Sequence, residues 1–230
     1  MKITTLNLQG FSDWESRQSA ITDHLKTTAS DIILFQEVVF LPHISPYNQV
    51  QILNQTLEYP HLSSAVTRLQ PSPHYETYRE GLALLSKYPI VASDTIILKQ
   101  APGDEHNRIV QLVDVLIDDH IVKIANVHFS LSDTIDYATA HLKETLEILA
   151  SRGEERIIVG DFNLDDLTAL SDLWSDQYRS SAEQEYISFP GENRRIDYFL
   201  VPKSYSFGDI TTSGDTLSDH RALTTELSKI

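Results

Sequence analysis

Short runs of branched aliphatic residues recur along the chain and predict most of its strands. Residues 2–7 alternate between apolar and polar positions, residues 31–39 form a longer apolar run, and residues 157–159 are all β-branched. Further strands are predicted at 82–86, 91–98, 109–117, 121–129, 195–201 and within 218–227. Because only residues 118–120 separate two of them, 109–117 and 121–129 are expected to form an antiparallel hairpin.

Helical periodicity falls between the predicted strands. Ser12 and Glu15 have the spacing of a capping box, and apolar residues on one helical face follow them. Apolar side chains recur at helical spacing in three more segments, 49–57, 134–150 and 165–173. Loops are expected where no periodicity is found, in the rest of 41–79 and in 99–108 and 174–194. Strands that alternate with helices predict an α/β (α+β) fold.

The composition is that of a globular protein without a basic surface. With 230 residues the chain has the length of one compact domain, which we expect to span residues 1–230. Hydrophobic residues make up 41% and charged residues 22%, which argues against disorder. The formal net charge of −15 disfavours binding to bulk nucleic acid or anionic lipid. The chain has no cysteine, which excludes disulfides and thiolate metal ligands.

The first residues lack the continuous apolar segment of a secretion signal. No later apolar run approaches the length of a membrane span. We therefore expect a cytoplasmic protein with no membrane span. No pattern in the sequence indicates an oligomeric state.

Polar residues stand at the ends of several predicted strands, where α/β sheets commonly bind ligands. Taken singly, each has an ordinary explanation, such as an Asx turn, a carboxylate that reaches solvent or a structural histidine. The set is Asn7, Glu37, His128, Asp161, Asn163, Asp197, Asp219 and His220. Oxygen donors with two histidines and no sulfur are what hydrolysis with a hard divalent cation requires.

The same residues lie within short motifs that occur in a fixed order. The motifs are Leu-Asn-Leu at 6–8, Phe-Gln-Glu-Val at 35–38, Gly-Leu-Ala-Leu-Leu-Ser-Lys-Tyr-Pro-Ile at 81–90, Asn-Val-His-Phe-Ser at 126–130, Gly-Asp-Phe-Asn at 160–163, Arg-Ile-Asp-Tyr at 195–198 and Ser-Asp-His at 218–220. In this order the chain resembles the endonuclease/exonuclease/phosphatase superfamily, with the deoxyribonuclease I-like fold, over nearly its whole length. The resemblance implies a four-layered sandwich of two packed mixed β-sheets flanked by helices, with the site at one edge.

The resemblance also implies a metal-dependent phosphoester hydrolase. It assigns Glu37, helped by Asn7, as the principal ligand of Mg²⁺, with Mn²⁺ as an alternative. Asp219 is expected to be a further ligand, directly or through water. The partner is then a phosphoester substrate that water attacks in line.

The remaining residues of the set take catalytic roles by the same resemblance. Asp161 is expected to orient or deprotonate the attacking water, and Asn163 to hold the phosphate. His220 is expected to act as general base or charge stabiliser, with its tautomer fixed by Asp197. His128 resembles the histidine that stabilises the pentacovalent phosphate or assists the leaving group. The sequence does not decide which histidine is the base.

Two departures from the family pattern weaken the case for a function in DNA repair. Gln9 and His128 stand where relatives resembling abasic-site endonucleases tend to have a carboxylate and an asparagine. The complete set of catalytic residues, the net charge of −15 and the lack of a secretion signal favour a small phosphodiester or phosphomonoester as the substrate. A nuclease acting on DNA or RNA is the first alternative, a sphingomyelinase-like phospholipid diesterase the second, and a catalytically silent binding module the non-enzyme alternative. Four residues are expected to contact substrate: Tyr78, Arg79, Arg108 and Arg195.

Overall fold

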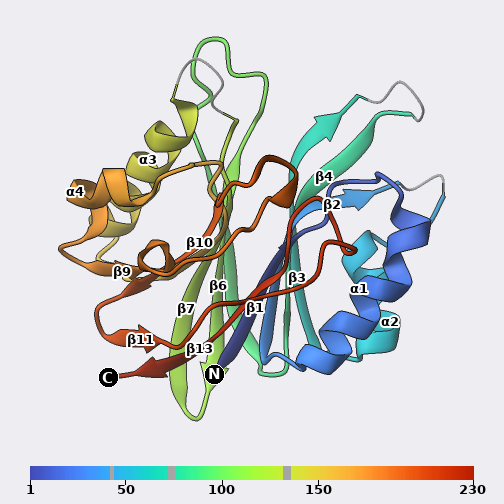
Figure 1. Ribbon diagram of the computed structural model, residues 1–230, viewed down its shortest axis with the longest axis horizontal. Helices are drawn as coiled ribbons and strands as arrows, with labels where there is room; N and C mark the ends of the chain where they lie inside the picture. The colour runs from blue at the N-terminus through green and yellow to red at the C-terminus, as the bar shows by residue number, and fades with distance from the viewer. Residues whose placement is uncertain (42–43, 72–75, 132–135) are drawn as a thin grey trace.

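Two β-sheets packed face to face form the centre of the structure, a computed structural model that describes residues 1–41, 44–71, 76–131 and 136–230 (Figure 1). The first sheet contains, in spatial order, β11 (Tyr205–Phe207), β13 (Leu223–Lys229), β1 (Lys2–Asn7), β2 (Ile32–Phe40), β4 (Tyr78–Ser86) and β3 (His61–Gln70), and β12 (Thr211–Thr212) also pairs with β13. The second contains β5 (Ile90–Ile97), β6 (Ile109–Ile117), β7 (His120–His128), β8 (Ile157–Asp161), β10 (Asp197–Pro202) and β9 (Tyr178–Ser180). Both sheets are mixed, because β1–β2 and β7–β8 are parallel pairs among antiparallel ones.

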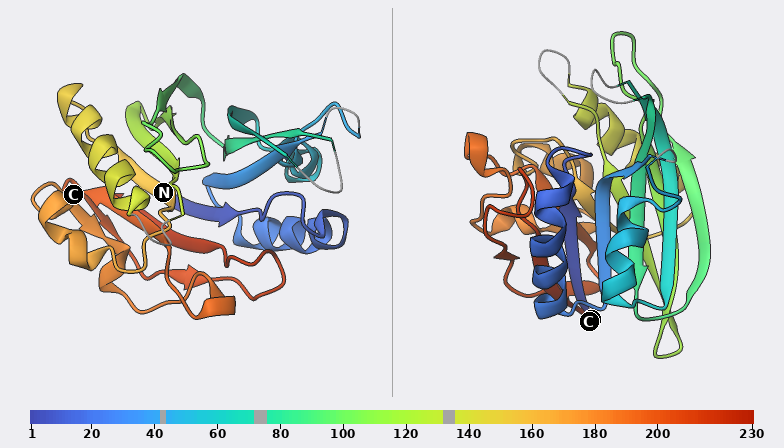
Figure 2. Two further views of the ribbon diagram at one scale, coloured as in Figure 1. Left: turned by 90° about the horizontal axis from the view of Figure 1, so that it is seen from above. Right: turned by 90° about the vertical axis from the view of Figure 1, so that its right-hand side faces the viewer.

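Helices cover the outer face of each sheet. α1 (Trp14–Thr28) and α2 (Gln49–Leu57) lie against the first sheet, and α3 (Tyr137–Ser151) and α4 (Ser171–Trp174) lie against the second (Figures 1 and 2). Short 3₁₀ turns occupy Thr168–Leu170, Ser181–Glu183 and Pro190–Glu192. The order helix, sheet, sheet, helix confirms the predicted four-layered sandwich.

Alternation along the central strands fills the interfaces between these layers. In β2, Phe35 packs in the cluster under α1 and α2, whereas its neighbour Leu34 packs between the two sheets. In the second sheet, Leu200 of β10 joins the cluster under α3, and Phe199 packs between the sheets. All four side chains are fully buried. A strand with apolar residues on both faces is what a sheet covered on both sides requires.

Several short or exposed strands were not predicted. β3 lies within 41–79, which was expected to be loop apart from the helix at 49–57, because only one edge of β3 is paired and its side chains are largely half-exposed. β9 falls in the expected loop 174–194, and β11 and β12 lie in a segment for which no strand was predicted. Two or three residues are too few to show a periodicity. The strand predicted at 195–201 begins at Asp197.

The helix starts differ from the predictions in two places. α1 is preceded by Asp13 in the left-handed conformation and has no side-chain cap, so the predicted capping box of Ser12 and Glu15 is wrong. The Ser12 carbonyl instead accepts from the buried Arg17 guanidinium. α3 begins at Tyr137 under an Asp136 cap, and the predicted start at 134–135 lies outside the described residues.

A layer of buried amides joins the two sheets beneath the carboxyl ends of their central strands. Asn126 of β7 accepts from Gln36 of β2 at 2.8 Å and donates to the Phe35 and Ala83 carbonyls and to Gln111 Oε1 at 3.1–3.2 Å. Gln36 is also bonded to Thr5 of β1. The layer fixes how the strands of one sheet sit against those of the other.

Replacing Asn126 tests the contribution of this layer. We expect Asn126→Leu to lower the free energy of unfolding by about 2–4 kcal/mol, because several buried polar groups lose their partner at once. Denaturant unfolding measures this change, with the exposed Asn107→Leu as the matched control. Equal stability of the two variants would show that the amide layer contributes little.

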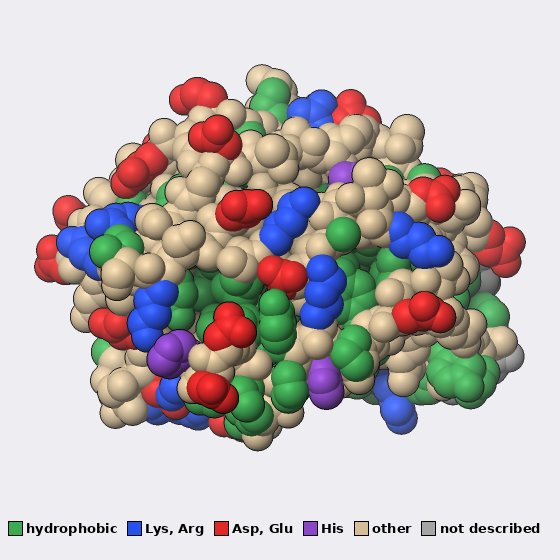
Figure 3. All heavy atoms as spheres, turned by 90° about the horizontal axis from the view of Figure 1, so that it is seen from below, with side chains coloured by type: hydrophobic (Ala, Val, Ile, Leu, Met, Phe, Trp, Pro, Cys, Tyr) green, Lys and Arg blue, Asp and Glu red, His purple; other side chains and the backbone are tan. Residues whose placement is uncertain are grey.

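The edge that holds both chain ends, at the bottom of Figure 1, carries charges of both signs. Seen from below, acidic and basic side chains are interspersed over this face with hydrophobic side chains between them (Figure 3). This view shows no broad basic surface, in line with the net charge of −15. Among the helices in the described part of the chain, none is both long and apolar enough to cross a membrane.

Candidate active site

The strand ends that carry the predicted polar residues point to the opposite edge of the sandwich, toward the top of Figure 1. The left panel of Figure 2 shows the molecule from this side. The carboxyl ends of β1, β2, β7 and β8 meet there with the amino ends of β10 and β13, because the latter two run antiparallel to their neighbours. The pairing of β7, β8 and β10 places three of these residues side by side. Asp161 pairs with His128 on one side and with Asp197 on the other, so these three residues lie abreast on adjacent strands.

Glu37 reaches this edge through a β-bulge. The register between β2 and β4 shifts between Phe35 and Val38, so Gln36 and Glu37 together face one residue of β4. Glu37 has a φ of 52°, in the left-handed region that residues other than glycine rarely adopt. Simple alternation would turn its side chain toward α1 and α2, as with Phe35. The bulge instead directs the carboxylate into the site, where the side chain is 27% exposed.

Asn7 connects the two sheets at the floor of the site. Its Nδ2 donates to Asp161 Oδ2 at 3.0 Å and to Glu37 Oε1 at 3.3 Å, and its Oδ1 accepts from the Gln9 backbone N–H at 2.9 Å. The amide thus presents its nitrogen to the two carboxylates and uses its oxygen within the β1–α1 loop. In this arrangement Asn7 positions Glu37 and Asp161, and its oxygen does not face them.

Asp161 and Asn163 are held by their own strand and by the loop after β7. The Asn163 N–H donates to Asp161 Oδ1 at 2.9 Å, and the Asn163 side chain donates to the Phe129 carbonyl at 2.9 Å. Asn163 has a φ of 50°, so the chain turns sharply after Asp161. Asp161 therefore has one oxygen fixed by the backbone and the other directed at Asn7 and the histidines.

His220 and Asp197 form a buried dyad. His220 Nδ1 lies 2.8 Å from Asp197 Oδ2, and its Nε2 lies 3.8 Å from Asp161 Oδ2. The Phe189 ring packs at 5.0 Å from the imidazole, centroid to centroid. The Ser188 hydroxyl accepts from the Asp197 N–H and so fixes the start of β10. With Nδ1 bonded to a carboxylate, the imidazole presents Nε2 to the centre of the site.

His128 approaches Asp161 from the other side. Its Nε2 lies 3.6 Å from Asp161 Oδ2 and 3.8 Å from Glu37 Oε1, and its Nδ1 is 2.9 Å from Nη1 of Arg108. Both His128 and Arg108 are buried. The Arg108 Nε, also buried, has no hydrogen-bond partner within the described part of the chain. Of the four expected substrate contacts, Arg108 is the one placed against a residue of the predicted set.

Two carboxylates and both histidines of the site have strongly altered pKa values. Burial, then Glu80 and Asp161, raise the pKa of Glu37 to about 7, and burial with Asp197 raises the pKa of Asp161 to about 6. Burial by itself would lower the pKa of His220, but the carboxylates of Asp197 and Asp161 outweigh it and raise that pKa to about 10. Burial and the neighbouring arginine hold the pKa of His128 well below its ordinary value. One histidine is thus cationic at neutral pH and the other neutral.

A pocket of about 540 Å³ opens beside Glu37, and the buried residues Asp161, Asp197 and His220 are not part of its lining. Asp219 and Tyr78 line it, together with Gln9, which accepts from the Asp219 N–H. Its volume is within the range of small-molecule sites in proteins. Asp219 is therefore on the open side of Glu37, and Tyr78 faces it from the start of β4.

The other two expected substrate contacts lie elsewhere in the fold. The Arg79 guanidinium stacks over the Phe40 ring at 5.8 Å. Arg195 lies over the rings of Tyr186 and Tyr198 and donates to the Gln184 carbonyl. Neither residue lines the pocket beside Glu37.

Three residues of the site, Glu80, His106 and Arg17, were not singled out from sequence. Glu80 at the start of β4 is buried, and its Oε1 accepts from Arg68 Nε at 2.9 Å. Arg68 also contacts His106. A charge at the end of an apolar run was the signal for Glu37, whereas Glu80 follows Arg79 and precedes the strand predicted at 82–86, so no pattern marked it. No signal pointed to Arg17, which donates to the carbonyls of Leu8, Ser12 and Leu217 and ties together the two loops that carry Gln9 and Asp219.

Three buried residues of the site can hold a metal ion. Asp161, Asp197 and, once its imidazole gives up a proton, His220 each offer one ligand atom, and these atoms lie within 4.8 Å of one another. Glu37 and Asp219 add oxygen donors on the open side. Burial and the neighbouring carboxylates raise the pKa values of Glu37 and Asp161, and a cation would offset both effects, so the residues present fit a divalent ion.

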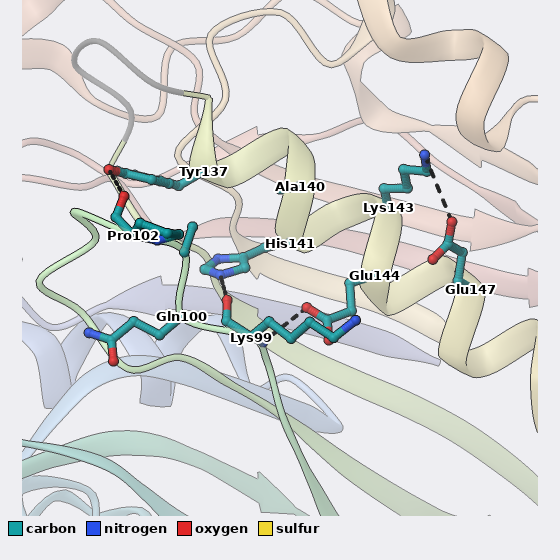
Figure 4. A pocket seen from close by; sticks show the side chains of 10 residues that line it. Lys99, Gln100, Pro102, Tyr137, Ala140, His141, Lys143, Glu144 and Glu147 are labelled. Carbon is teal, nitrogen blue, oxygen red and sulfur yellow. Dashed lines mark hydrogen bonds and ion pairs between the residues drawn. The ribbon is translucent and has the colours of Figure 1, made fainter.

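A second pocket, of about 460 Å³, lies between α3 and the loop that follows β5 (Figure 4). Three of its charged side chains have partners nearby. Lys143 pairs with Glu147 at 3.9 Å, and Glu144 accepts from the Lys99 N–H. The buried His141 lies at its floor with both ring nitrogens hydrogen-bonded. Of the predicted residues, Glu37, Asp219 and Tyr78 line the first pocket, and none lines this one.

Comparisons with known proteins agree with this fold. A model of the Endonuclease/Exonuclease/phosphatase family matches residues 4–220. No curated protein matches the chain. Among solved structures, an endonuclease/exonuclease/phosphatase family protein from Leptotrichia buccalis is similar with a TM-score of 0.80 and 17% identity, over 99% of both chains.

Two further similar structures belong to proteins with more specific names. The mannosyl-6-phosphatase of Bacteroides thetaiotaomicron has a TM-score of 0.71 and 18% identity, over 99% of both chains. The human Nocturnin catalytic domain has a TM-score of 0.75 and 16% identity, over 100% of this chain and 94% of that one. At these identities the likeness shows a shared fold.

Proposed function

The chain belongs to the endonuclease/exonuclease/phosphatase family, and from that premise we propose that it is a Mg²⁺-dependent phosphohydrolase that cleaves a small phosphodiester or phosphomonoester. One observation carries the proposal. Asp161 lies between two histidine Nε2 atoms, at 3.6 and 3.8 Å, with the carboxylate of Glu37 alongside. A carboxylate, two nitrogen donors and a cation-binding oxygen around one point are what hydrolysis of a phosphate ester uses.

Glu37 is the residue proposed to hold Mg²⁺, with Asp219 beside it. Both line the open pocket and both offer only oxygen, which suits a hard cation that keeps several waters. A bound Mg²⁺ would supply positive charge to a phosphate oxygen of the substrate. Asn7 supports the site by holding Glu37, since its amide nitrogen contacts that carboxylate. Mn²⁺ prefers similar ligands and is the expected substitute.

The attacking water is assigned to Asp161. With a pKa of about 6, this carboxylate is ionised at neutral pH and still accepts a proton readily. His220 keeps its own proton up to about pH 10, so at neutral pH it donates from Nε2 and stabilises negative charge on the phosphate. Asn163 holds Asp161 through its N–H, and its contact with phosphate stays a prediction.

A nucleic acid substrate is less well supported. A groove for a long polyanion needs cationic side chains directed at the backbone. Here Arg68 is bonded to Glu80, Arg194 to Asp165 and Glu192, and Arg195 lies over aromatic rings. These arginines serve the protein itself, which favours a small substrate in the 540 Å³ pocket.

A panel of substrates tests the proposal. Purified protein with Mg²⁺ or Mn²⁺ is offered bis-p-nitrophenyl phosphate, p-nitrophenyl phosphate, single- and double-stranded DNA, RNA and sphingomyelin. We expect turnover of a small ester that chelation of the metal abolishes. Faster cleavage of nucleic acid or sphingomyelin would replace the small-substrate assignment. No turnover on any member, with no thermal shift on adding Mg²⁺, would favour a binding module.

A further inference from the structure

The hydrogen bond between Arg108 and His128 determines which nitrogen of His128 carries a proton. Nη1 of Arg108 lies 2.9 Å from Nδ1 of the imidazole. A guanidinium has five N–H donors and no acceptor, and it does not lose its proton in proteins. Nδ1 must therefore be the acceptor, and an imidazole that accepts at Nδ1 is neutral and has its proton on Nε2.

No ion pair among the described residues competes with the bond from Arg108 to His128. Arg108 is 3% exposed, and no carboxylate forms an ion pair with it among the described residues. The buried Glu80 carboxylate accepts a hydrogen bond from Arg68 Nε instead, at 2.9 Å. His128 is thus paired at Nδ1 with a cation, whereas His220 is paired at Nδ1 with the Asp197 carboxylate.

The Nε2–H of His128 remains available in the site. The closest acceptors are Asp161 Oδ2 at 3.6 Å and Glu37 Oε1 at 3.8 Å, both beyond hydrogen-bond distance. A phosphate oxygen between these carboxylates and the imidazole would meet a donor that is already oriented.

We infer that Arg108 is a positioning residue that locks His128 in the neutral Nε2–H tautomer, so that His128 donates a hydrogen bond to a phosphoryl oxygen of the substrate and transfers no proton. The inference deepens the proposed hydrolysis and rests on it for the identity of the substrate. A neutral imidazole that polarises a reacting oxygen is an established catalytic device.

In the reaction that follows from this assignment, His128 neither gives nor takes a proton. Water forms the new bond to phosphorus and gives its proton to the Asp161 carboxylate. The bond from phosphorus to the leaving oxygen breaks, that oxygen takes a proton from solvent water, and the hydroxide left behind takes up the proton that Asp161 then releases. His128 keeps its Nε2 proton throughout and strengthens its hydrogen bond as charge develops on the phosphoryl oxygen.

The loop that brings Arg108 to His128 is anchored by a second histidine of the same tautomer. His141 accepts at Nδ1 from the Ser130 N–H at 3.3 Å, and its Nε2 donates to the Lys99 carbonyl at 3.2 Å (Figure 4). It thereby joins the segment after His128 to the segment that leads to Arg108. Because its bonds do not involve Arg108, His141 is an internal reference for the test.

Long-range ¹H–¹⁵N correlation spectra of ¹⁵N-histidine-labelled protein, recorded without metal or substrate, test the inference. The His128 and His141 signals are assigned from their loss in His128→Gln and His141→Gln. We expect wild-type His128 to show a protonated Nε2 and an unprotonated Nδ1. Arg108→Lys should retain this pattern, Arg108→Met should convert His128 to a tautomer mixture, and His141 should stay unchanged in both. Arg68→Gln, which removes a nearby charge but not the bond, should also leave the His128 tautomer unchanged.

A wild-type His128 with its proton on Nδ1, or on both nitrogens, would overturn the inference whether or not the enzyme is active. The same holds for a His128 tautomer that is unchanged in a folded Arg108→Met. If Arg108→Met does not fold, the wild-type and Arg108→Lys spectra decide. A catalytically inactive protein with the expected spectrum would overturn the proposed hydrolysis and leave the tautomer assignment standing. On an active substrate, Arg108→Met should lose about 10–100-fold in kcat, with partial rescue in Arg108→Lys.

Discussion

Glu37→Gln is expected to abolish metal-dependent hydrolysis and at the same time to stabilise the metal-free protein. Activity should fall by about 10³-fold or more, because the principal ligand of the catalytic cation is lost. The pKa of Glu37 is raised to about 7 by burial and by Glu80 and Asp161, so the folded state favours its protonated form. That contribution to stability is present below about pH 4 and is lost as the pH rises through about 7.

At pH 8 the neutral glutamine should therefore raise the free energy of unfolding by on the order of 2 kcal/mol in the presence of chelator, with a smaller gain at pH 5. Denaturant unfolding at both pH values measures this gain, and thermal unfolding with added Mg²⁺ should show a shift in the wild type but none in Glu37→Gln. Glu147→Gln, at an exposed ion pair of α3, is the matched control. A Glu37→Gln protein that retains the Mg²⁺ shift would show that the cation binds elsewhere, with Asp161, Asp197 and His220 as the other available set.

Asp197→Asn is expected to move the alkaline limb of the pH–rate profile to lower pH. The Asp197 carboxylate is the main group that raises the pKa of His220 to about 10, against the effect of burial. Without it the imidazolium loses its proton at lower pH, and its charge is no longer available to the phosphate at pH 8. We expect kcat at that pH to fall by about 10²–10⁴-fold.

In Asp197→Asn the acid limb of the pH–rate profile should stay at the same pH or move to lower pH. It reports Asp161, whose pKa of about 6 is raised by burial and by Asp197 itself. The same raised pKa of His220 contributes stability that is present below pH 6.5 and lost as the pH rises through about 10, and this contribution should disappear in the variant. The exposed Asp209→Asn is the control. If the rate instead increases as His220 loses its proton, then His220 and not Asp161 is the general base.

The central strands and their polar ends could be predicted because one physical constraint governs both. A strand that is covered on two faces must be apolar throughout, as at 157–159, so a polar residue such as Asp161 at its end is conspicuous. The edge strand β3 has no such constraint, and its half-exposed residues gave no period to detect. The bulge at Glu37 was also hidden, because it depends on the pairing of β2 with β4 and not on local sequence.

Partners within the site were harder to predict than its members. Arg108 was expected to contact substrate, and its bond to His128 depends on residues 20 positions apart becoming neighbours across β6 and β7. Arg79 and Arg195 are arginines in the same sequence neighbourhoods as the motifs, yet they stack on aromatic rings away from the pocket. Sequence alone does not show the direction of a long side chain at the start of a strand.

Hydrolysis of the best ester in the panel, carried out in ¹⁸O-labelled water with Mg²⁺, tests the central claim most directly. Wild-type protein should release a phosphate product with one ¹⁸O atom per turnover and an unlabelled alcohol, and His220→Ala and chelated wild type should release almost none. Label in the alcohol, or turnover that survives both chelation and His220→Ala, would contradict attack of water on phosphorus at this site.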